Sequence, residues 1–178
     1  CSPVTTASLG ISSVEITGSK TQDAANGLPK HCVLTGFANQ RTGVDGKSYA
    51  IGFQLRLPAE WNGRFLHQVN GGNDGVVVPA LGSLPDGLAS GGTVPLARGF
   101  AVVSTDSGHQ GAVFDNAFMK DQEAAINFAS ASVGKVTLAA KAIIARYYGQ
   151  QTKRSYFAGC STGGREGMLA STRYSSEF

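Results

Sequence analysis

Charged side chains are scarce in this sequence, at 15% of the residues, and no stretch gathers the Lys and Arg that give the net charge of +3. Without such a cluster, neither a nucleic-acid-binding surface nor electrostatic docking to a membrane is expected. No apolar run approaches the ~20 residues needed to span a bilayer. A signal peptide is also missing, so we expect a mature or trimmed form of one globular domain, or part of one.

Cysteine is rare as well. Cys1, Cys32 and Cys160 are the only cysteines, and their number is odd. Cys1 and Cys32 both lie in the N-terminal segment, and we expect them to form a disulfide there. Cys160 then lacks a partner within the chain, which in a secreted or periplasmic protein suggests a bond to a cysteine outside it. A buried free thiol is the alternative.

Glycine, by contrast, is abundant, and five residues at 159–163 (Gly-Cys-Ser-Thr-Gly) form the pattern G-x-S-x-G. A β-like run precedes them and a helix-permissive run follows, which is the strand–turn–helix context of a nucleophile elbow. The turn is strained, so its flanks must be small, as Gly159 and Gly163 are.

In such an elbow Ser161 is the nucleophile, and the backbone N–H of Thr162 and the positive end of the next helix face a developing oxyanion. In a chain with 24 glycines the pattern alone also fits a plain turn that contains an ordinary serine.

A second glycine-rich segment lies at residues 70–75 (Asn-Gly-Gly-Asn-Asp-Gly), called the glycine loop below. It follows a predicted strand at 64–70, where the second oxyanion donor of an α/β-hydrolase is found. Gly71 or Gly72 is therefore the candidate donor, and a plain turn is the alternative. Asp74 is expected to order this loop, since no cluster of further ligands supports a metal role.

The first half of the chain favours strands. Residues 1–47 are predicted to be an irregular or β lead-in, with one short strand around residues 11–16 and the start of another at 29–36. Alternating apolar residues at 49–58 indicate a strand. We expect this strand to form a hairpin with the strand at 64–70.

The second half alternates between strand and helix. Residues 76–94 are expected to be irregular and 95–98 a short helical turn. The apolar run 99–104 is typical of a buried parallel strand. Residues 121–148 carry apolar side chains at helical spacing and should form a helix that Gly149 caps. This order predicts a strand–helix–strand unit in a mostly parallel sheet with flanking helices.

Four polar residues invite catalytic roles that we do not assign. His31 is interpreted as a surface or strand residue, and His67 as a packing residue within its strand. Asp106 and His109 follow the strand at 99–104, where open α/β sheets place their sites. In α/β-hydrolases the acid and the histidine follow the serine, so we expect both to order their loop instead.

Three stretches resemble a known family. They are residues 56–66 (Arg-Leu-Pro-Ala-Glu-Trp-Asn-Gly-Arg-Phe-Leu) with the glycine loop behind them, 104–109 (Ser-Thr-Asp-Ser-Gly-His), and 156–165 (Tyr-Phe-Ala-Gly-Cys-Ser-Thr-Gly-Gly-Arg). From about residue 32 to the last, the chain is similar to the N-terminal portion of the tannase and feruloyl esterase family of serine esterases.

The resemblance implies an α/β-hydrolase fold with a large lid inserted after the elbow. It also implies that Ser161 is the nucleophile and that Thr162 and a glycine of the loop are the oxyanion donors. Cys160 would form a disulfide to a cysteine beside the catalytic histidine. Substrates of the family are esters of aromatic acids, such as galloyl, feruloyl and other hydroxycinnamoyl esters or terephthalate monoesters.

One departure from the family is large, because no Asp and no His follow Ser161. The catalytic acid, the histidine, the lid and any calcium ion in it would come from a second polypeptide or from residues outside this sequence, linked through Cys160. No cofactor is expected in this chain, and residues 48–178 would contain the sheet, the glycine loop and the elbow.

The sequence thus predicts the N-terminal part of a secreted or periplasmic carboxylic ester hydrolase that is inactive as this chain alone. Two alternatives stay open. One is a non-catalytic fragment that binds a partner or a polyphenol, and the other is an acyltransferase that uses the same serine.

Overall fold

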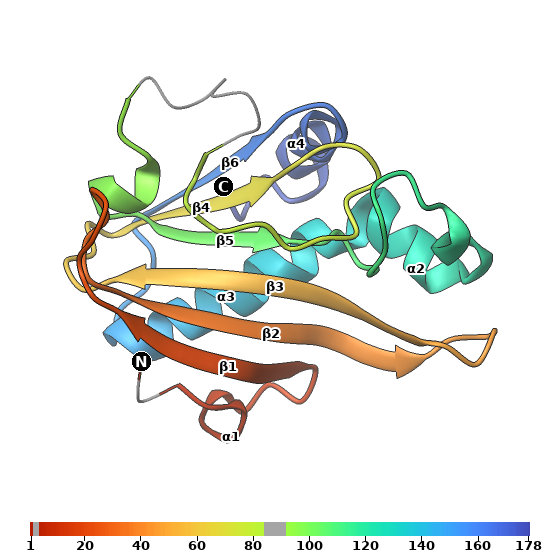
Figure 1. Cartoon of the computed structure of the whole chain (residues 1–178), viewed down its shortest axis with the longest axis horizontal. Helices are drawn as coiled ribbons and strands as arrows, with labels where there is room; N and C mark the ends of the chain where they lie inside the picture. The colour runs from red at the N-terminus through yellow and green to blue at the C-terminus, as the bar shows by residue number, and fades with distance from the viewer. Residues whose placement is uncertain (2–3, 84–91) are drawn as a thin grey trace.

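A computed structural model describes residues 1, 4–83 and 92–178, and within them six strands form one sheet in the order β1-β2-β3-β5-β4-β6 (Figure 1). The strands are β1 (Val14–Gln22), β2 (His31–Thr42), β3 (Ser48–Pro58), β4 (Arg64–Val69), β5 (Ala101–Thr105) and β6 (Arg154–Gly159). The helices are α1 (Thr6–Leu9), α2 (Gln122–Ile126), α3 (Ser132–Tyr148) and α4 (Thr162–Arg173), with 3₁₀ turns at Pro95–Arg98 and Ala117–Lys120.

The sheet is mixed. β4 pairs parallel with β5 on one side and with β6 on the other. β1, β2 and β3 form an antiparallel meander, and β3 pairs antiparallel with β5. The parallel pairing that the sequence predicted is therefore confined to β5, β4 and β6, which is the part of the sheet that ends at the elbow.

The predicted hairpin between the strands now labelled β3 and β4 is wrong, because β5 lies between them. Val103 of β5 has Leu55 of β3 as its partner on one side and His67 of β4 on the other. Every residue of β5 is buried, and a strand that is apolar on both faces suits a central position. The turn at 59–63 is held at the start of this strand by the Asn62 N–H, which donates to the Gly99 carbonyl at 3.0 Å.

The N-terminal lead-in is more ordered than expected. β1 pairs with β2 from Val14 to Gln22 and so extends the same sheet, whereas Ile11 lies outside the strand. The expected disulfide between Cys1 and Cys32 is present and joins the N-terminus to β2. The expectations for residues 2–3 and 84–91 lie outside the described residues.

Two apolar layers cover the sheet. α3 runs across one face behind β2, β3 and β5 (Figure 1), and its side chains enter the main core. That core contains Leu34, Ile51, Phe53 and Leu55 of the sheet with Val136, Ala140, Ile143 and Ile144 of α3. On the other face Leu66 and Val102 pack against Ala80, Leu96 and Phe100, which belong to the segment between β4 and β5.

The predicted helix at 121–148 is present, with Gly149 in the left-handed conformation as its cap. It contains a π-helical segment at Asn127–Ala131 between α2 and α3. By length and composition, the helical stretch Gln122–Tyr148 is apolar enough to be a candidate membrane span, although no apolar run of that length was expected from the sequence. Half of its most apolar window is buried against the protein, as in a core helix.

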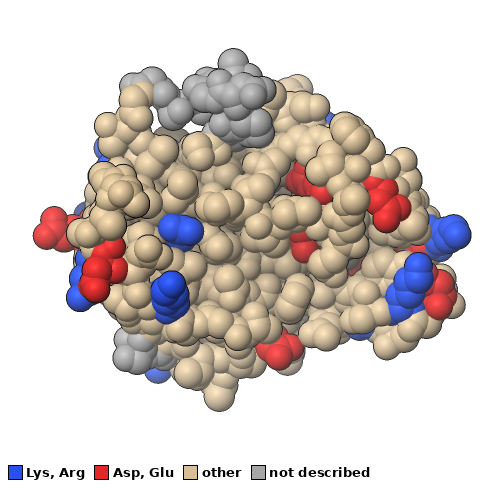
Figure 2. Space-filling view, in the orientation of Figure 1, with Lys and Arg blue, Asp and Glu red and all other residues tan. Residues whose placement is uncertain are grey.

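The surface shown in Figure 2 carries Lys and Arg in separate positions rather than in one basic patch. This distribution agrees with the absence of a Lys/Arg cluster from the sequence.

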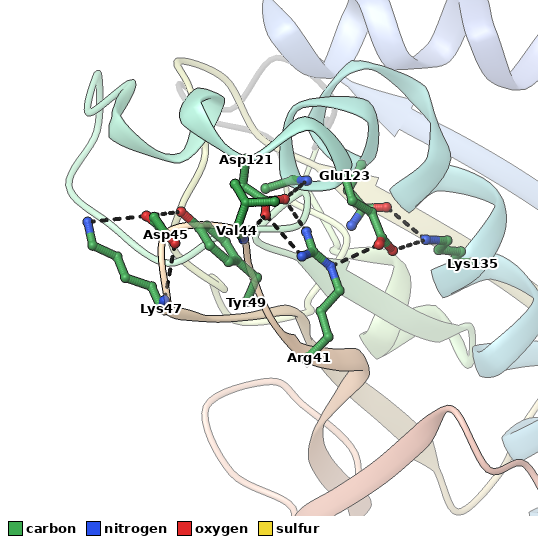
Figure 3. Close-up of polar contacts among 10 residues, drawn as sticks. Arg41, Val44, Asp45, Lys47, Tyr49, Asp121, Glu123 and Lys135 are labelled. Atoms are coloured by element: carbon green, nitrogen blue, oxygen red, sulfur yellow. Dashed lines mark hydrogen bonds and ion pairs between the residues drawn. The ribbon is translucent and has the colours of Figure 1, made fainter.

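One polar cluster fastens the β2–β3 hairpin to the start of α2 (Figure 3). The buried Asp121 carboxylate accepts two hydrogen bonds from the Arg41 guanidinium, one from the Val44 N–H at 3.1 Å and one from the Ala124 N–H at 2.9 Å. Arg41 also lies 2.9 Å from the Glu123 carboxylate. These donors, Arg41 first, hold the pKa of Asp121 well below its usual range.

We expect Asp121→Asn to lower the thermal midpoint by several degrees at pH 7, because the carboxylate that accepts these bonds is lost. A depressed pKa contributes stability above the unfolded-state pKa of about 4, and that stability disappears as the pH falls toward the folded value. The difference in thermal midpoint between the wild type and the variant should therefore stay constant from pH 7 to pH 5 and begin to narrow as the pH falls below about 4. Asp23→Asn, at an exposed residue, is the control. If the thermal midpoints of Asp121→Asn and wild type change in parallel with pH, the stabilising role of the Asp121 carboxylate is contradicted.

Candidate active site

Three loops meet at one edge of the sheet, because β4, β5 and β6 are parallel and end there together. The glycine loop follows β4, residues 106–111 follow β5, and Cys160 and Ser161 follow β6. Sites in open α/β sheets form at this carboxyl edge. The fold thus brings together the two glycine-rich segments that the sequence singled out.

Ser161 occupies the turn between β6 and α4, with φ 56° and ψ −115°. A positive φ is costly for a residue with a side chain, and the strained turn predicted for a nucleophile elbow would require such a conformation. A Cβ at Gly159 would lie 2.4 Å from the Gly163 carbonyl, and one at Gly163 would lie 2.4 Å from the Asn70 oxygen. The strand–turn–helix geometry therefore requires both glycines.

The glycine loop is tied to the elbow by its backbone. The Gly163 N–H donates to the Asn70 carbonyl at 2.8 Å, and the Thr162 hydroxyl donates to the Gly72 carbonyl. A Cβ on Gly71 would lie 3.1 Å from the Cβ of Ser161 and 3.7 Å from its hydroxyl oxygen. Of the two candidate glycines, Gly71 thus runs alongside the serine, while Gly72 faces the side chain of Val113.

His67 is buried in β4, as the sequence predicted. Its Nδ1 lies 2.9 Å from the Thr137 hydroxyl, and its ring packs against Phe157. Burial lowers the pKa of His67 to about 3, so the ring is neutral. His31 begins β2 with its Nδ1 2.7 Å from the Pro29 carbonyl, and at 1% exposure it is a strand residue rather than a surface one.

Asp106 and His109 lie in the loop after β5, and their surroundings fit loop-ordering roles. The Asp106 carboxylate accepts hydrogen bonds from the Gly52 and Gly108 N–H groups and from the Gln110 side chain. The His109 ring stacks on Phe118 with 3.6 Å between the ring centres. In the described part of the chain, neither side chain hydrogen-bonds to Ser161.

Cys160 precedes Ser161 and is a free, partly buried thiol among the described residues. Within the same residues, no group of three or more His, Cys, Asp or Glu side chains gathers in a way that could hold a metal ion.

A family model for tannase and feruloyl esterase matches residues 32–178. The chain belongs to this family. It is 44% identical to mono(2-hydroxyethyl) terephthalate hydrolase of Piscinibacter sakaiensis over 87% of its own length and 26% of that relative. It is 34% identical to a probable feruloyl esterase B-2 of Aspergillus flavus, over 70% of this chain and 22% of that one.

The fold agrees with that of a solved structure from the same family. The crystal structure of feruloyl esterase B from Aspergillus oryzae superposes with a TM-score of 0.75 at 23% identity, over 97% of this chain and 34% of that one. The chain therefore spans about a quarter to a third of the length of these relatives, and the expected α/β-hydrolase-like arrangement is present over that part.

Two buried carboxyl groups at the site of this family member were not predicted to act together. Glu166 is the fifth residue of α4 and fully buried, and Asp74 lies in the glycine loop at 4% exposure. The Ser107 hydroxyl donates to Asp74 at 2.6 Å. Burial, and then the Asp74 charge, raises the pKa of Glu166 to about 8, and burial raises that of Asp74 to about 6.

A signal for the burial of Glu166 was present in the sequence. Gly163, Glu166 and Ala170 are the buried residues of α4, and their spacing of three and four places them on one helix face. Small residues on that face let the helix approach the sheet closely, and Glu166 is carried inward with them.

A cavity of about 530 Å³ opens beside the glycine loop. Its wall is mostly apolar, and Phe114, with φ 71°, is 73% exposed at its rim. The lining residues are Gln68, Asn70, Gly71, Gly72, Asp74, Val76, Val78, Pro79, Leu81, Ser83, Val113 and Phe114.

Proposed function

We propose that this chain is the N-terminal part of a secreted or periplasmic serine carboxylic ester hydrolase that acts on esters of aromatic acids. The observation that carries the proposal is the conformation of Ser161. A serine with φ 56° at a strand-to-helix turn, with the Gly71 backbone alongside its hydroxyl, is arranged for nucleophilic attack next to an oxyanion site.

In the proposed reaction a histidine removes the proton of Ser161 as its oxygen attacks the ester carbonyl. The N–H groups of Thr162 and of Gly71 or Gly72 stabilise the oxyanion of the tetrahedral intermediate. The alcohol leaves with the proton from the histidine, and an acyl-enzyme remains. Water, activated by the same histidine, then releases the acid and regenerates Ser161.

The histidine and its acid come, in this proposal, from outside the chain, because no His or Asp follows Ser161. They would belong to a second polypeptide or to a further segment that carries the lid. Cys160 would join that part to the elbow through a disulfide. No cofactor is assigned to this chain, and any calcium ion would belong to the lid.

The proposed substrate class rests on the relatives and on the cavity. Two relatives are named for a feruloyl ester and for a terephthalate monoester, and both of these acids are aromatic. A mostly apolar cavity beside the glycine loop suits a planar ring better than a charged group. Phe114 and Val113 lie against Gly72, where an aromatic ring held near Ser161 would reach them.

Accordingly, we expect Phe114→Ala to raise KM for methyl ferulate about 5- to 10-fold, since an aromatic contact contributes ~1 kcal/mol. KM for a short aliphatic ester should change less than about twofold. Val44→Ala, at an exposed apolar residue in the β2–β3 hairpin, is the control. Equal changes in KM for both esters would show that Phe114 does not contact the aromatic ring of the substrate.

The function itself is tested with the complete enzyme, that is, this chain with the part that supplies the acid and the histidine. Methyl ferulate, a gallate ester and mono(2-hydroxyethyl) terephthalate are offered with aliphatic esters, and the products are separated. Release of the free aromatic acid supports the proposal. New esters formed from added alcohols in preference to the acid would indicate an acyltransferase, and no turnover would indicate a binding fragment.

A further inference from the structure

The glycine loop and α4 each contribute one buried carboxyl group, and the two groups interact with each other and share Ser107 and Arg165 as neighbours. Asp74 comes from the loop that carries Gly71, and Glu166 comes from the helix that begins directly after Ser161. Within the described residues, Oδ1 of Asp74 and both carboxyl oxygens of Glu166 are buried and have no hydrogen-bond partner. A buried ionised carboxyl group without partners is costly, so one of the two must hold a proton.

The neighbouring groups favour Glu166 as the protonated member. Asp74 accepts the Ser107 hydroxyl at 2.6 Å, which stabilises its charged form. Arg165 is the only cation near Glu166 in the described part of the chain, and it lies 3.5 Å from one carboxyl oxygen. Its guanidinium also donates to the Phe128 carbonyl at 2.9 Å and lies over the Phe128 ring, and its charge only partly offsets the burial that raises the pKa of Glu166.

We propose that Glu166 is a positioning residue, which in its protonated form lies against the Asp74 carboxylate and Ser107 and fixes the glycine loop to the elbow. The backbone bonds of Asn70 and Gly72 fasten the first half of the loop, and the carboxyl pair fastens the second half. This role rests on the proposed ester hydrolysis and deepens it, because the loop that is held carries the candidate oxyanion donor.

Ionisation of Glu166 would place two negative charges in one buried region. The groups that interact with this pair among the described residues are Ser107, Arg165 and Asp106, whose own pKa burial raises to about 7. As the pH rises through about 8, where Glu166 loses its proton, the loop should move away from Ser161. Turnover then falls, although Ser161 and its histidine are unchanged.

The test compares Glu166→Gln, Glu166→Ala and wild type in the complete enzyme, with the exposed Glu60→Gln as control. Glu166→Ala should lower kcat about 10- to 100-fold with KM changed less than about threefold, because the donor is displaced from the transition state. Glu166→Gln should keep kcat within about threefold at pH 7, since an amide donates without charge. It should also lack the fall in kcat near pH 8 that the wild type shows.

A second readout does not depend on activity. Because the folded-state pKa of Glu166 is raised, its contribution to stability is complete below the unfolded value of about 4 and is lost as the pH rises through about 8. The thermal midpoint of the wild type should therefore fall relative to that of Glu166→Gln between pH 5 and pH 9. The proposal is overturned if the thermal midpoints of wild type and Glu166→Gln change in parallel with pH and if kcat falls in the same way for both at alkaline pH.

The two proposals fail differently. Persistent hydrolysis by Ser161→Ala would remove the proposed function and leave the stability comparison as the test of the carboxyl pair. An inactive Ser161→Ala alongside Glu166 variants that match the wild type in kcat, alkaline limb and melting curves would overturn the carboxyl pair alone.

Discussion

Replacing Ser161 with alanine should lower kcat for aromatic ester hydrolysis by at least about 10⁴-fold in the complete enzyme, because the attacking oxygen is removed. The fold should persist. The backbone of Ser161 is held between β6 and α4 by Gly159 and Gly163, and its side chain caps nothing in the described structure. Steady-state kinetics with methyl ferulate, with a thermal melt of the same sample, measures both effects.

Ser171→Ala is the matched control, since Ser171 lies on the exposed side of the same helix and bonds only to the Met168 carbonyl in the described structure. Its kinetics should equal those of the wild type. If Ser161→Ala keeps more than about a tenth of the wild-type kcat, which no triad serine does, another residue is the nucleophile.

Replacing Gly159 with alanine, which adds a single methyl group, should have the second largest effect on kcat. Its Cβ would lie 2.4 Å from both the carbonyl carbon and the oxygen of Gly163, so the end of β6 and the start of α4 must separate. Ser161 lies between these two glycines and would move with them. We expect Gly159→Ala to lower kcat about 100-fold and to destabilise the fold by about 1–3 kcal/mol.

Gly164 offers a close control for this substitution. It is the third residue of α4, but a Cβ there would meet its nearest atom, the Gly159 oxygen, at 3.9 Å. Gly164→Ala should therefore leave kcat unchanged and stabilise α4 slightly, because alanine is the better helix former. Both variants are measured by kcat and by denaturant unfolding. Equal losses would show that the effect does not come from the contact between Gly159 and Gly163, and a Gly159→Ala variant without loss would show that the elbow tolerates a side chain there.

The sequence predicted the parts of the fold that depend on local patterns. Alternating apolar residues predicted β3, and the apolar run at 99–104 predicted β5. Apolar residues at helical spacing, followed by Gly149, predicted the end of α3. The position of β5 between β3 and β4 could not be found in this way, since it depends on which strands pair at long range. The full length of β1 in the N-terminal lead-in was not predicted for the same reason, because β1 is stabilised by its pairing with β2.

The candidate site was predicted to a similar degree. Ser161 and the two glycines of the loop follow from short motifs with a known backbone requirement, and the structure brings Gly71 rather than Gly72 beside the serine. The electrostatic interaction between Asp74 and Glu166 could not be predicted. It depends on the close approach of α4 to the glycine loop, which residue types alone do not specify.

The most direct test of the account is to trap the nucleophile. The complete enzyme is treated with a fluorophosphonate and digested, and the modified peptide is sequenced by tandem mass spectrometry. The account predicts one adduct, on Ser161, with loss of ester hydrolysis in proportion to labelling. An active enzyme that labels at a different residue, or that stays unlabelled while it hydrolyses aromatic esters, would contradict it.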